Sequence, residues 1–131
     1  MADTYTQLYV HIVFTVQNHI SLISKKWEER LYQYITGIIR NHEHRLIAIN
    51  GTSDHIHILM GLNPNQSLSI IMREIKSDSS RWINENRFVQ GKFSWQAGYG
   101  AFSYSRSQIS TVAKYIENQK IKDASQENFI Y

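Results

Sequence analysis

The sequence contains no cysteine and only one proline among its 131 residues. Without cysteine, the chain has no disulfide framework, no thiolate metal site and no cysteine nucleophile. Its longest apolar runs are far shorter than the roughly 20 residues that span a bilayer, and its N-terminus lacks a basic segment followed by an apolar one. One proline and six glycines leave little material for a long flexible linker. We therefore expect a soluble, cytoplasmic, non-membrane protein with a single domain over residues 1–131.

The charge and the aromatic content permit a nucleic-acid partner without requiring one. The formal net charge is +3, and the chain has eight tyrosines and three tryptophans. Such rings can stack on unpaired bases, but they are also ordinary core and interface material. Composition alone leaves both interpretations open.

The hydrophobic pattern switches between period two and helical period along the chain. The order is β-α-β-β-α-β followed by a C-terminal helix, which is the ferredoxin-like, split βαβ arrangement of an α+β fold. In this fold the two main helices cover one face of an antiparallel sheet, and the other face is free for a ligand, a partner subunit or nucleic acid. We expect strands at 5–18, 44–51, 52–62 and 93–105 and helices at 25–42, 67–86 and 107–120.

Local signals mark the boundaries between these elements. The dipeptide Asn50-Gly51 is a strong hairpin signal, although residues 52–54 could lengthen the loop. Gly98 and Gly100 indicate a bulge or bend in the last strand. The expected helix N-caps are Ser24 and Ser107.

Two histidines, His55 and His57, alternate with isoleucines in "DHIHIL". On a strand both imidazoles project from one face, here the open one, while Ile56 and Ile58 point toward the helices. That spacing suits two ligands of one metal ion, although such a site needs further ligands. The alternative is two half-exposed strand histidines, one of them hydrogen-bonded.

The other candidate histidines carry weaker signals. His42 and His44 lie at a helix end, where a cationic imidazole suits the helix dipole, and we interpret them as structural or incidental. His11 lies on the first strand and could approach the histidine pair, but we expect a core or surface role for it.

In "AKYIENQ", Tyr115 and Gln119 are spaced i, i+4 and share one face of the last helix. A tyrosine can act as a covalent nucleophile when the phenol or its electrophile is activated. A glutamine carbonyl oxygen can be a third metal ligand. The alternative is a packed tyrosine and a solvated glutamine. We expect Ile109, Val112 and Ile116 to form the packing stripe.

Four segments together, "TSDHIHILMGL", "REIKSDSSRWI", "FSWQAGYGAFSYS" and "VAKYIENQ", cover nearly the whole chain. In this order they resemble the single-tyrosine HUH transposases of small insertion sequences, the IS200-like and REP-associated tyrosine transposases. The resemblance implies DNA transposition by cleavage and rejoining of single-stranded DNA. It implies that His55, His57 and Gln119 bind Mg²⁺ or Mn²⁺ and that Tyr115 forms a 5′-phosphotyrosine.

The resemblance also implies partners. Family members are dimers in which the tyrosine helix of one subunit can complete the metal site of the other, and their substrates carry hairpins near the element ends. Our candidates for phosphate contacts are Arg73, Lys76, Arg81 and Arg87; the alternative is a solvated basic helix face. The tail "KIKDASQENFIY" departs from the family, in which paired histidines or acidic residues and a longer tail often follow the tyrosine.

Two other functions can be weighed against this one. A non-catalytic or domesticated single-strand or hairpin binder could use the same fold, and "GYGAF" partly matches the RNA-binding strand of RRM domains. That motif lacks its leading basic residue here and explains neither the histidines nor Tyr115. A histidine-triad hydrolase needs a third histidine at position 59, which is leucine.

Overall fold

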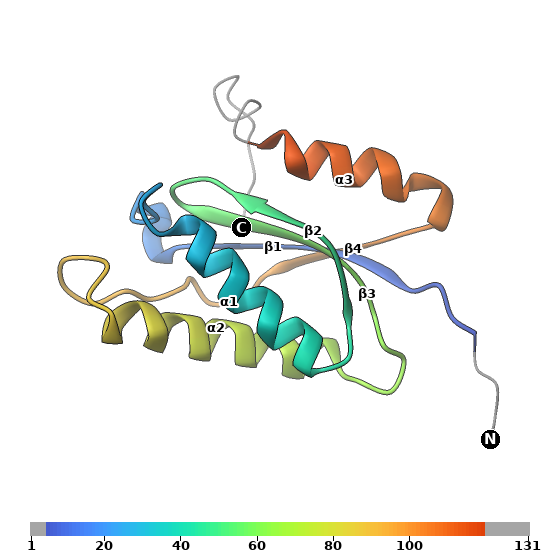
Figure 1. Ribbon diagram of the computed structural model, residues 1–131, viewed down its shortest axis with the longest axis horizontal. Coiled ribbons are helices and arrows are strands. Elements are labelled where there is room, and N and C mark those ends of the chain that lie inside the picture. The colour runs from blue at the N-terminus through green and yellow to red at the C-terminus, as the bar shows by residue number, and fades with distance from the viewer. Residues whose placement is uncertain (1–4, 120–131) are drawn as a thin grey trace.

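Hydrophobic alternation builds one four-stranded sheet with helices on both faces (Figure 1). The computed structural model describes residues 5–119. All pairings are antiparallel, and the strand order is β2-β3-β1-β4. This confirms the predicted split βαβ order and the α+β class. The elements are β1 (Tyr9–Thr15), η1 (Gln17–His19), α1 (Glu28–Asn41), β2 (Arg45–Gly51), β3 (His55–Gly61), α2 (Leu68–Glu85), β4 (Gly100–Tyr104), η2 (Arg106–Gln108) and α3 (Ile109–Glu117).

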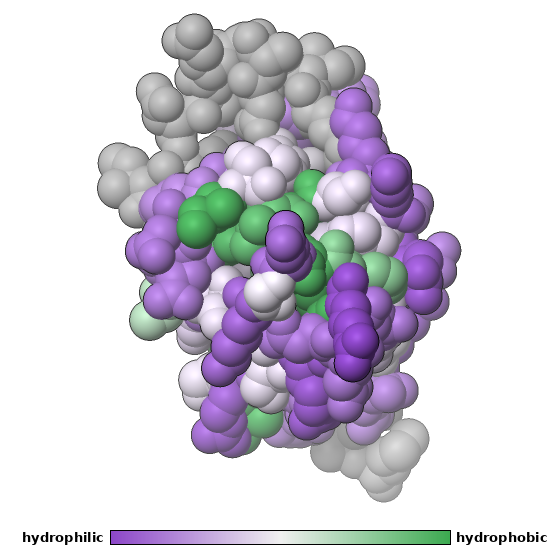
Figure 2. All heavy atoms as spheres, turned by 90° about the vertical axis from the view of Figure 1, so that its left-hand side faces the viewer, coloured by the Kyte–Doolittle hydropathy of each residue, from purple (hydrophilic) through white to green (hydrophobic). Residues whose placement is uncertain are grey.

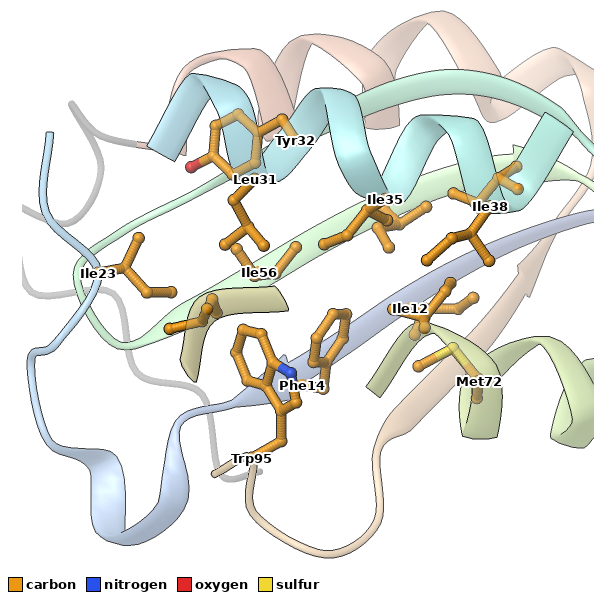
Figure 3. Packing of buried hydrophobic residues seen from close by; sticks show 14 of the residues in the cluster. Ile12, Phe14, Ile23, Leu31, Tyr32, Ile35, Ile38, Ile56, Met72 and Trp95 are labelled. Carbon is orange, nitrogen blue, oxygen red and sulfur yellow. The ribbon is translucent and has the colours of Figure 1, made fainter. Parts of the chain in front are cut away.

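The main core lies between the sheet and the two helices α1 and α2. Every second residue of β1 and β3 points into it, so Ile12, Phe14, Ile56 and Ile58 are fully buried there. Figure 3 shows the side chains of Ile12, Phe14 and Ile56 meeting those of α1 and α2, with Trp95 close to Phe14. The indole packs edge-on against that phenyl ring at 4.7 Å between centroids. The alternation predicted for the first and third strands is confirmed.

Helix α3 lies on the opposite face of the sheet from α1 and α2 (Figure 1). Val112 and Ile116 pack there on Ala48 and Leu59, as a second, smaller cluster of buried residues. The predicted packing stripe of this helix is therefore confirmed. The expectation that this face is free is wrong, because α3 covers the β2–β3 part of it. The helix predicted to run to residue 120 ends at Glu117, with Asn118 as its C-cap; residue 120 and the tail after it lie outside the described residues.

Two helix starts differ from the prediction. Ser24 begins a separate turn, since its carbonyl oxygen accepts hydrogen bonds from the amides of Trp27 and Glu28, and α1 starts only at Glu28. Ser105, not Ser107, forms the capping box ahead of α3, with Gln108 as its partner. Both differences arise because a short turn precedes the regular helix.

The hairpin between β2 and β3 has a longer loop than the Asn50-Gly51 signal indicates. Asn50 and Gly51 remain in the ladder, opposite His57 and Ile56, and the loop consists of residues 52–54. A Cβ added at Gly51 would lie 2.3 Å from the carbonyl oxygen of His55. Glycine is used here for a close backbone approach rather than for a two-residue turn.

Only the second half of the predicted fourth strand is regular. Residues 93–98 precede β4 without belonging to it, apart from an isolated bridge between Trp95 and Val16. The ammonium group of Lys76 donates to the carbonyl oxygens of Gln96 and Gly98, at 2.6 and 2.7 Å. Gly98 has a φ of 83°, which confirms the predicted bend. Among residues 5–119, no helix combines the length and apolar character needed to cross a membrane.

Candidate functional site

The histidines of β3 lie on the sheet face that α3 covers. His57 is 0% exposed and His55 is 7% exposed, so neither stands on an open surface as the sequence led us to expect. Burial, and then the neighbouring His55 and His11, lower the pKa of His57 to about 2. His57 is therefore neutral at physiological pH, which is the form that binds a metal.

Each imidazole has a side-chain neighbour at hydrogen-bond distance from its Nδ1, and both Nε2 atoms are buried. His55 Nδ1 lies 2.7 Å from Asp54 Oδ1 and 3.0 Å from Thr52 Oγ1. The Thr52 hydroxyl also donates to Asp54 Oδ1 at 3.0 Å. The loop between β2 and β3 therefore supplies a carboxylate that orients the ring of His55.

His57 has a different partner, the His11 side chain on β1. Its Nδ1 lies 2.8 Å from His11 Nε2, and the two rings stack with centroids 5.1 Å apart. His11 is 4% exposed, and burial lowers its pKa to about 4. The sequence placed His11 on the correct strand face but gave no register between β1 and β3, so its contact with His57 could not be predicted.

Tyr115 lies on α3 beside this histidine pair. Its half-buried ring meets His57 edge-on, with centroids 6.0 Å apart, and His11 at 6.5 Å. The Asn50 amide donates to the carbonyl oxygens of Ile116 and Glu117, at 3.0 Å each. Because Asn50 pairs with His57 across the ladder, this contact fastens the end of α3 directly beside the histidines.

Gln119 follows two residues after α3 ends, and its side chain is fully buried. Its Oε1 atom is buried, as are the two histidine Nε2 atoms. Within residues 5–119, no group of three or more His, Cys, Asp or Glu side chains is arranged to hold a metal. The candidate donors are instead two imidazoles and an amide oxygen. Each imidazole has its Nδ1 already oriented by a neighbour, so this donor set fits a divalent metal.

His42 and His44 make structural contacts away from this cluster, as we expected. His42 Nε2 lies 2.6 Å from Glu74 Oε2, which links α1 to α2. His44 Nδ1 accepts a hydrogen bond from the amide of Asn63 at 2.9 Å. Neither side chain takes part in the cluster around His57.

A groove of about 1000 Å³ runs between α2 and the segment before β4. Arg73, Lys76 and Arg81, three of the four predicted phosphate contacts, line it, and Lys92 and Tyr99 join them. Arg87 lies instead at a smaller hollow beyond the end of α2, with Gly91. Figure 2 looks onto this end of the molecule, where mostly hydrophilic side chains surround a small apolar area.

The groove's cations differ in what they contact. Lys76 is engaged with the carbonyl oxygens of Gln96 and Gly98, and burial lowers its pKa. Arg81 donates to Asp78 Oδ1 at 3.1 Å, yet its side chain remains mostly exposed. Lys76 therefore holds the wall of the groove in place. Arg73, Arg81 and Lys92 are the cations that remain for an anionic ligand.

A four-stranded sheet with this helix arrangement is also the fold of solved transposase structures. A candidate transposase from Deinococcus radiodurans superimposes with a TM-score of 0.73 at 19% identity, covering 91% of this chain and 95% of that one. A REP-associated tyrosine transposase bound to a REP hairpin gives a TM-score of 0.71 at 16% identity, covering 94% and 73%. These likenesses show the fold that this chain shares with those structures.

Sequence comparison then gives the family. The family model described as "Transposase IS200 like" matches residues 4–119, and the chain belongs to that family. The ISDra2 transposase TnpA of Deinococcus radiodurans is a relative at 21% identity over 122 residues, covering 89% of this chain and 87% of the relative. The resemblance found in the sequence is thereby confirmed.

Proposed function

We propose that this transposase cleaves and rejoins single-stranded DNA through a covalent bond to Tyr115. The observation that carries the proposal is the position of Tyr115, whose ring lies edge-on against His57 at 6.0 Å, on the helix that covers the histidine pair. Family membership supports DNA transposition in general. The two imidazoles and the adjacent phenol supply the groups that this particular reaction needs.

In the proposed reaction the Tyr115 oxygen attacks the phosphorus of a DNA phosphodiester. A bond forms between the phenolic oxygen and phosphorus, and the bond from phosphorus to the 3′ oxygen breaks. The phenol gives up its proton, and the departing 3′ oxygen takes one up as a free hydroxyl. The resulting 5′-phosphotyrosine keeps the energy of the phosphodiester, so a different 3′-hydroxyl can reverse the step and join new strands.

His55, His57 and Gln119 would hold the divalent metal, through the two Nε2 atoms and Oε1. Mg²⁺ or Mn²⁺ bound there would polarise a phosphate oxygen and stabilise the negative charge that develops on it. Asp54 holds the ring of His55. Asn50 holds the end of the helix that carries Tyr115.

We further propose that the substrate is single-stranded DNA containing a hairpin and that phosphates bind along the groove beside α2. Arg73, Arg81 and Lys92 line this groove together with Tyr99, whose ring can stack on an unpaired base. A solved relative is described as bound to a REP hairpin, which supports this class of ligand. Such contacts make binding weaken steeply with added salt.

A homodimer is part of the proposal, since one tyrosine per chain requires two chains to cut two ends. Strand β4 supports it: this strand ends the sheet order and pairs only with β1 among the described strands. Its central residues, 101–103, are exposed. An exposed strand edge is a ready site for pairing with a second chain.

The test is a cleavage assay with a hairpin oligonucleotide taken from the DNA that borders the gene. With Mn²⁺, we expect a band that resists denaturation, with protein attached to the 5′ side of the cut. Tyr115→Phe should abolish the adduct while the oligonucleotide still binds, and a chelator should abolish it in the wild type.

The matched control is Tyr104→Phe, because Tyr104 is another tyrosine close to His11, at 6.2 Å between ring centroids. It should retain adduct formation. An adduct that survives in Tyr115→Phe but disappears in Tyr104→Phe would contradict our assignment of the nucleophile. Binding without cleavage by the wild type, across metals and border sequences, would favour a non-catalytic hairpin-binding protein.

A further inference from the structure

His11 is a buried polar side chain to which the proposed reaction gives no role. It lies on β1 directly opposite Leu59 of β3. His57 is two residues before Leu59 on the same face of β3, so it is the diagonal neighbour of His11. The rings of Phe102 and Tyr104 on β4 pack against it at 6.0 and 6.2 Å. Strands on both sides therefore fix the imidazole in place, so its contact with His57 does not depend on a flexible loop.

The hydrogen bond between the two rings allows two arrangements of the protons. In the first, His57 Nδ1–H donates to His11 Nε2, and His57 Nε2 carries a lone pair. In the second, His11 Nε2–H donates to His57 Nδ1, and the His57 proton sits on Nε2. Only the first arrangement lets His57 Nε2 bind a metal, because the second places a hydrogen where the ion would be.

The other nitrogen of His11, Nδ1, does not favour either of the two proton arrangements. His11 Nδ1 is buried and has no hydrogen-bond partner among residues 5–119. No neighbouring donor or acceptor in this part of the chain therefore fixes the tautomer of His11. A group bound at His57 Nε2 would distinguish the two arrangements, because that nitrogen carries a lone pair in one and a proton in the other.

We propose that His11 is a positioning residue for the metal ligand His57: its Nε2 accepts the Nδ1–H of His57 and so holds that ring in the metal-binding tautomer and orientation. Asp54 orients the ring of His55 in the same way. The acceptor for His57 is a neutral imidazole on the sheet, whereas the acceptor for His55 is a carboxylate in a loop. This inference rests on the proposed metal site, and it concerns a residue that does not itself bind the ion.

The test compares three variants of the full chain without DNA. His11→Phe keeps an aromatic ring but removes the acceptor, and His11→Gln returns an amide oxygen as acceptor. His44→Phe is the matched control, since His44 is also buried at 4% exposure but bonds to Asn63 at the opposite end of β3. Far-UV circular dichroism and urea unfolding first establish that each variant is folded.

Two measurements follow, Mn²⁺ binding by calorimetry and the imidazole ¹⁵N signals of His57 with Mg²⁺. We expect His11→Phe to weaken Mn²⁺ binding by about 10- to 100-fold, His11→Gln to recover part of that loss, and His44→Phe to bind as the wild type does. In the wild type, Mg²⁺ should shift His57 to the Nδ1–H form. In His11→Phe this shift should need correspondingly more Mg²⁺.

The possible failures can be told apart. If the wild type binds Mn²⁺ and His11→Phe binds it equally tightly with the same His57 tautomer, the role of His11 is refuted and the metal site stands. If His11→Gln is as weak as His11→Phe although both are folded, the acceptor role is refuted. If the wild type binds neither Mn²⁺ nor Mg²⁺ while still forming the adduct, the metal site itself is refuted, and the role of His11 with it.

Discussion

Replacing Gly51 with alanine tests how closely β2 and β3 approach each other beside the histidines. An added Cβ would lie 2.3 Å from the carbonyl oxygen of His55, and 3.1 and 3.2 Å from Cδ1 and Cα of Ile56. Two of these three neighbours are backbone atoms, which cannot turn away as a side-chain tip can. Gly51→Ala must therefore move the backbone at the start of β3, where His55 is attached.

The size of the effect follows from these distances. Cβ atoms in proteins essentially never approach another heavy atom within 3.0 Å, so the two strands must separate locally by about 0.7 Å. Overpacking of this kind typically costs about 1–3 kcal/mol of stability. We expect a loss near the upper end, about 2–3 kcal/mol, because the clash involves a ladder backbone rather than a flexible side chain.

Gly37→Ala is the matched control for this substitution. Gly37 lies within α1, and nothing stands within 4 Å of the Cβ it would gain. Alanine at that position should stabilise the protein by about 0.5–1 kcal/mol, because glycine is a poor helix former. The two Gly→Ala variants should therefore move the urea midpoint in opposite directions.

The functional readout of the pair is Mn²⁺ binding. Gly51→Ala should weaken it because His55 is displaced, whereas Gly37→Ala should leave it unchanged. If Gly51→Ala were as stable as the wild type and bound Mn²⁺ normally, the close approach between β2 and β3 described here would be incorrect. If both substitutions lowered the urea midpoint equally, the space around each added Cβ would not be what determines the change in stability.

Two further predictions concern α3 and the buried histidines. Asn50→Ala should loosen α3 by removing two hydrogen bonds to its last carbonyl oxygens, which hydrogen exchange would detect as faster exchange in residues 109–117 with β1 and β3 unchanged. Burial lowers the pKa of His11 to about 4 and that of His57 to about 2, whereas both return toward 6.5 in the unfolded chain. The unfolded state therefore binds more protons below about pH 6.5, and the free energy of unfolding should fall as the pH drops from about 7 to about 4. Urea titrations across that range check this, and a flat profile would contradict the neutral burial of these rings.

The sheet topology could be predicted from sequence because it depends on strong, local signals. Alternating residues on β1 and β3 place Ile12, Phe14, Ile56 and Ile58 on one face, and helical periodicity identifies α1 and α2. Once the order β-α-β-β-α-β is fixed, few arrangements can bury all these apolar faces at once. The position of the main core follows from that constraint.

The irregular parts could not be predicted, because tertiary contacts shape them. Residues 93–98 look like a strand in sequence, but they join the sheet only through an isolated bridge at Trp95, and the carbonyl oxygens of Gln96 and Gly98 accept hydrogen bonds from Lys76. Asn50-Gly51 looks like a two-residue turn, but the glycine serves a close approach between strands. In both places the deciding contact comes from a residue that is not adjacent in sequence.

In the candidate site, too, some features follow from local periodicity and others depend on tertiary contacts. The common face of His55 and His57 is a periodic property of one strand, so the sequence contains it. The predicted helical spacing of Tyr115 and Gln119 does not hold in the same way, because α3 ends at Glu117 and Gln119 follows it. His11 could not be assigned to the site because its contact depends on cross-strand register, which pairs it with Leu59, two residues after His57 on the same face of β3. Only the assembled sheet supplies that information.

Helix α3 covers the sheet face that the sequence led us to expect to be open, and it also carries Tyr115, the proposed nucleophile. A helix whose stripe is Val112 and Ile116 must cover an apolar surface, and Ala48 and Leu59 provide one on the face that carries the histidines. The same docking that brings Tyr115 to His57 therefore also excludes solvent from that imidazole. This cluster is far smaller than the core under α1 and α2, so α3 is more weakly held than the rest of the fold. Under the proposed function, a DNA phosphate must reach the buried Nε2 of His57, and α3 is the element that covers this imidazole.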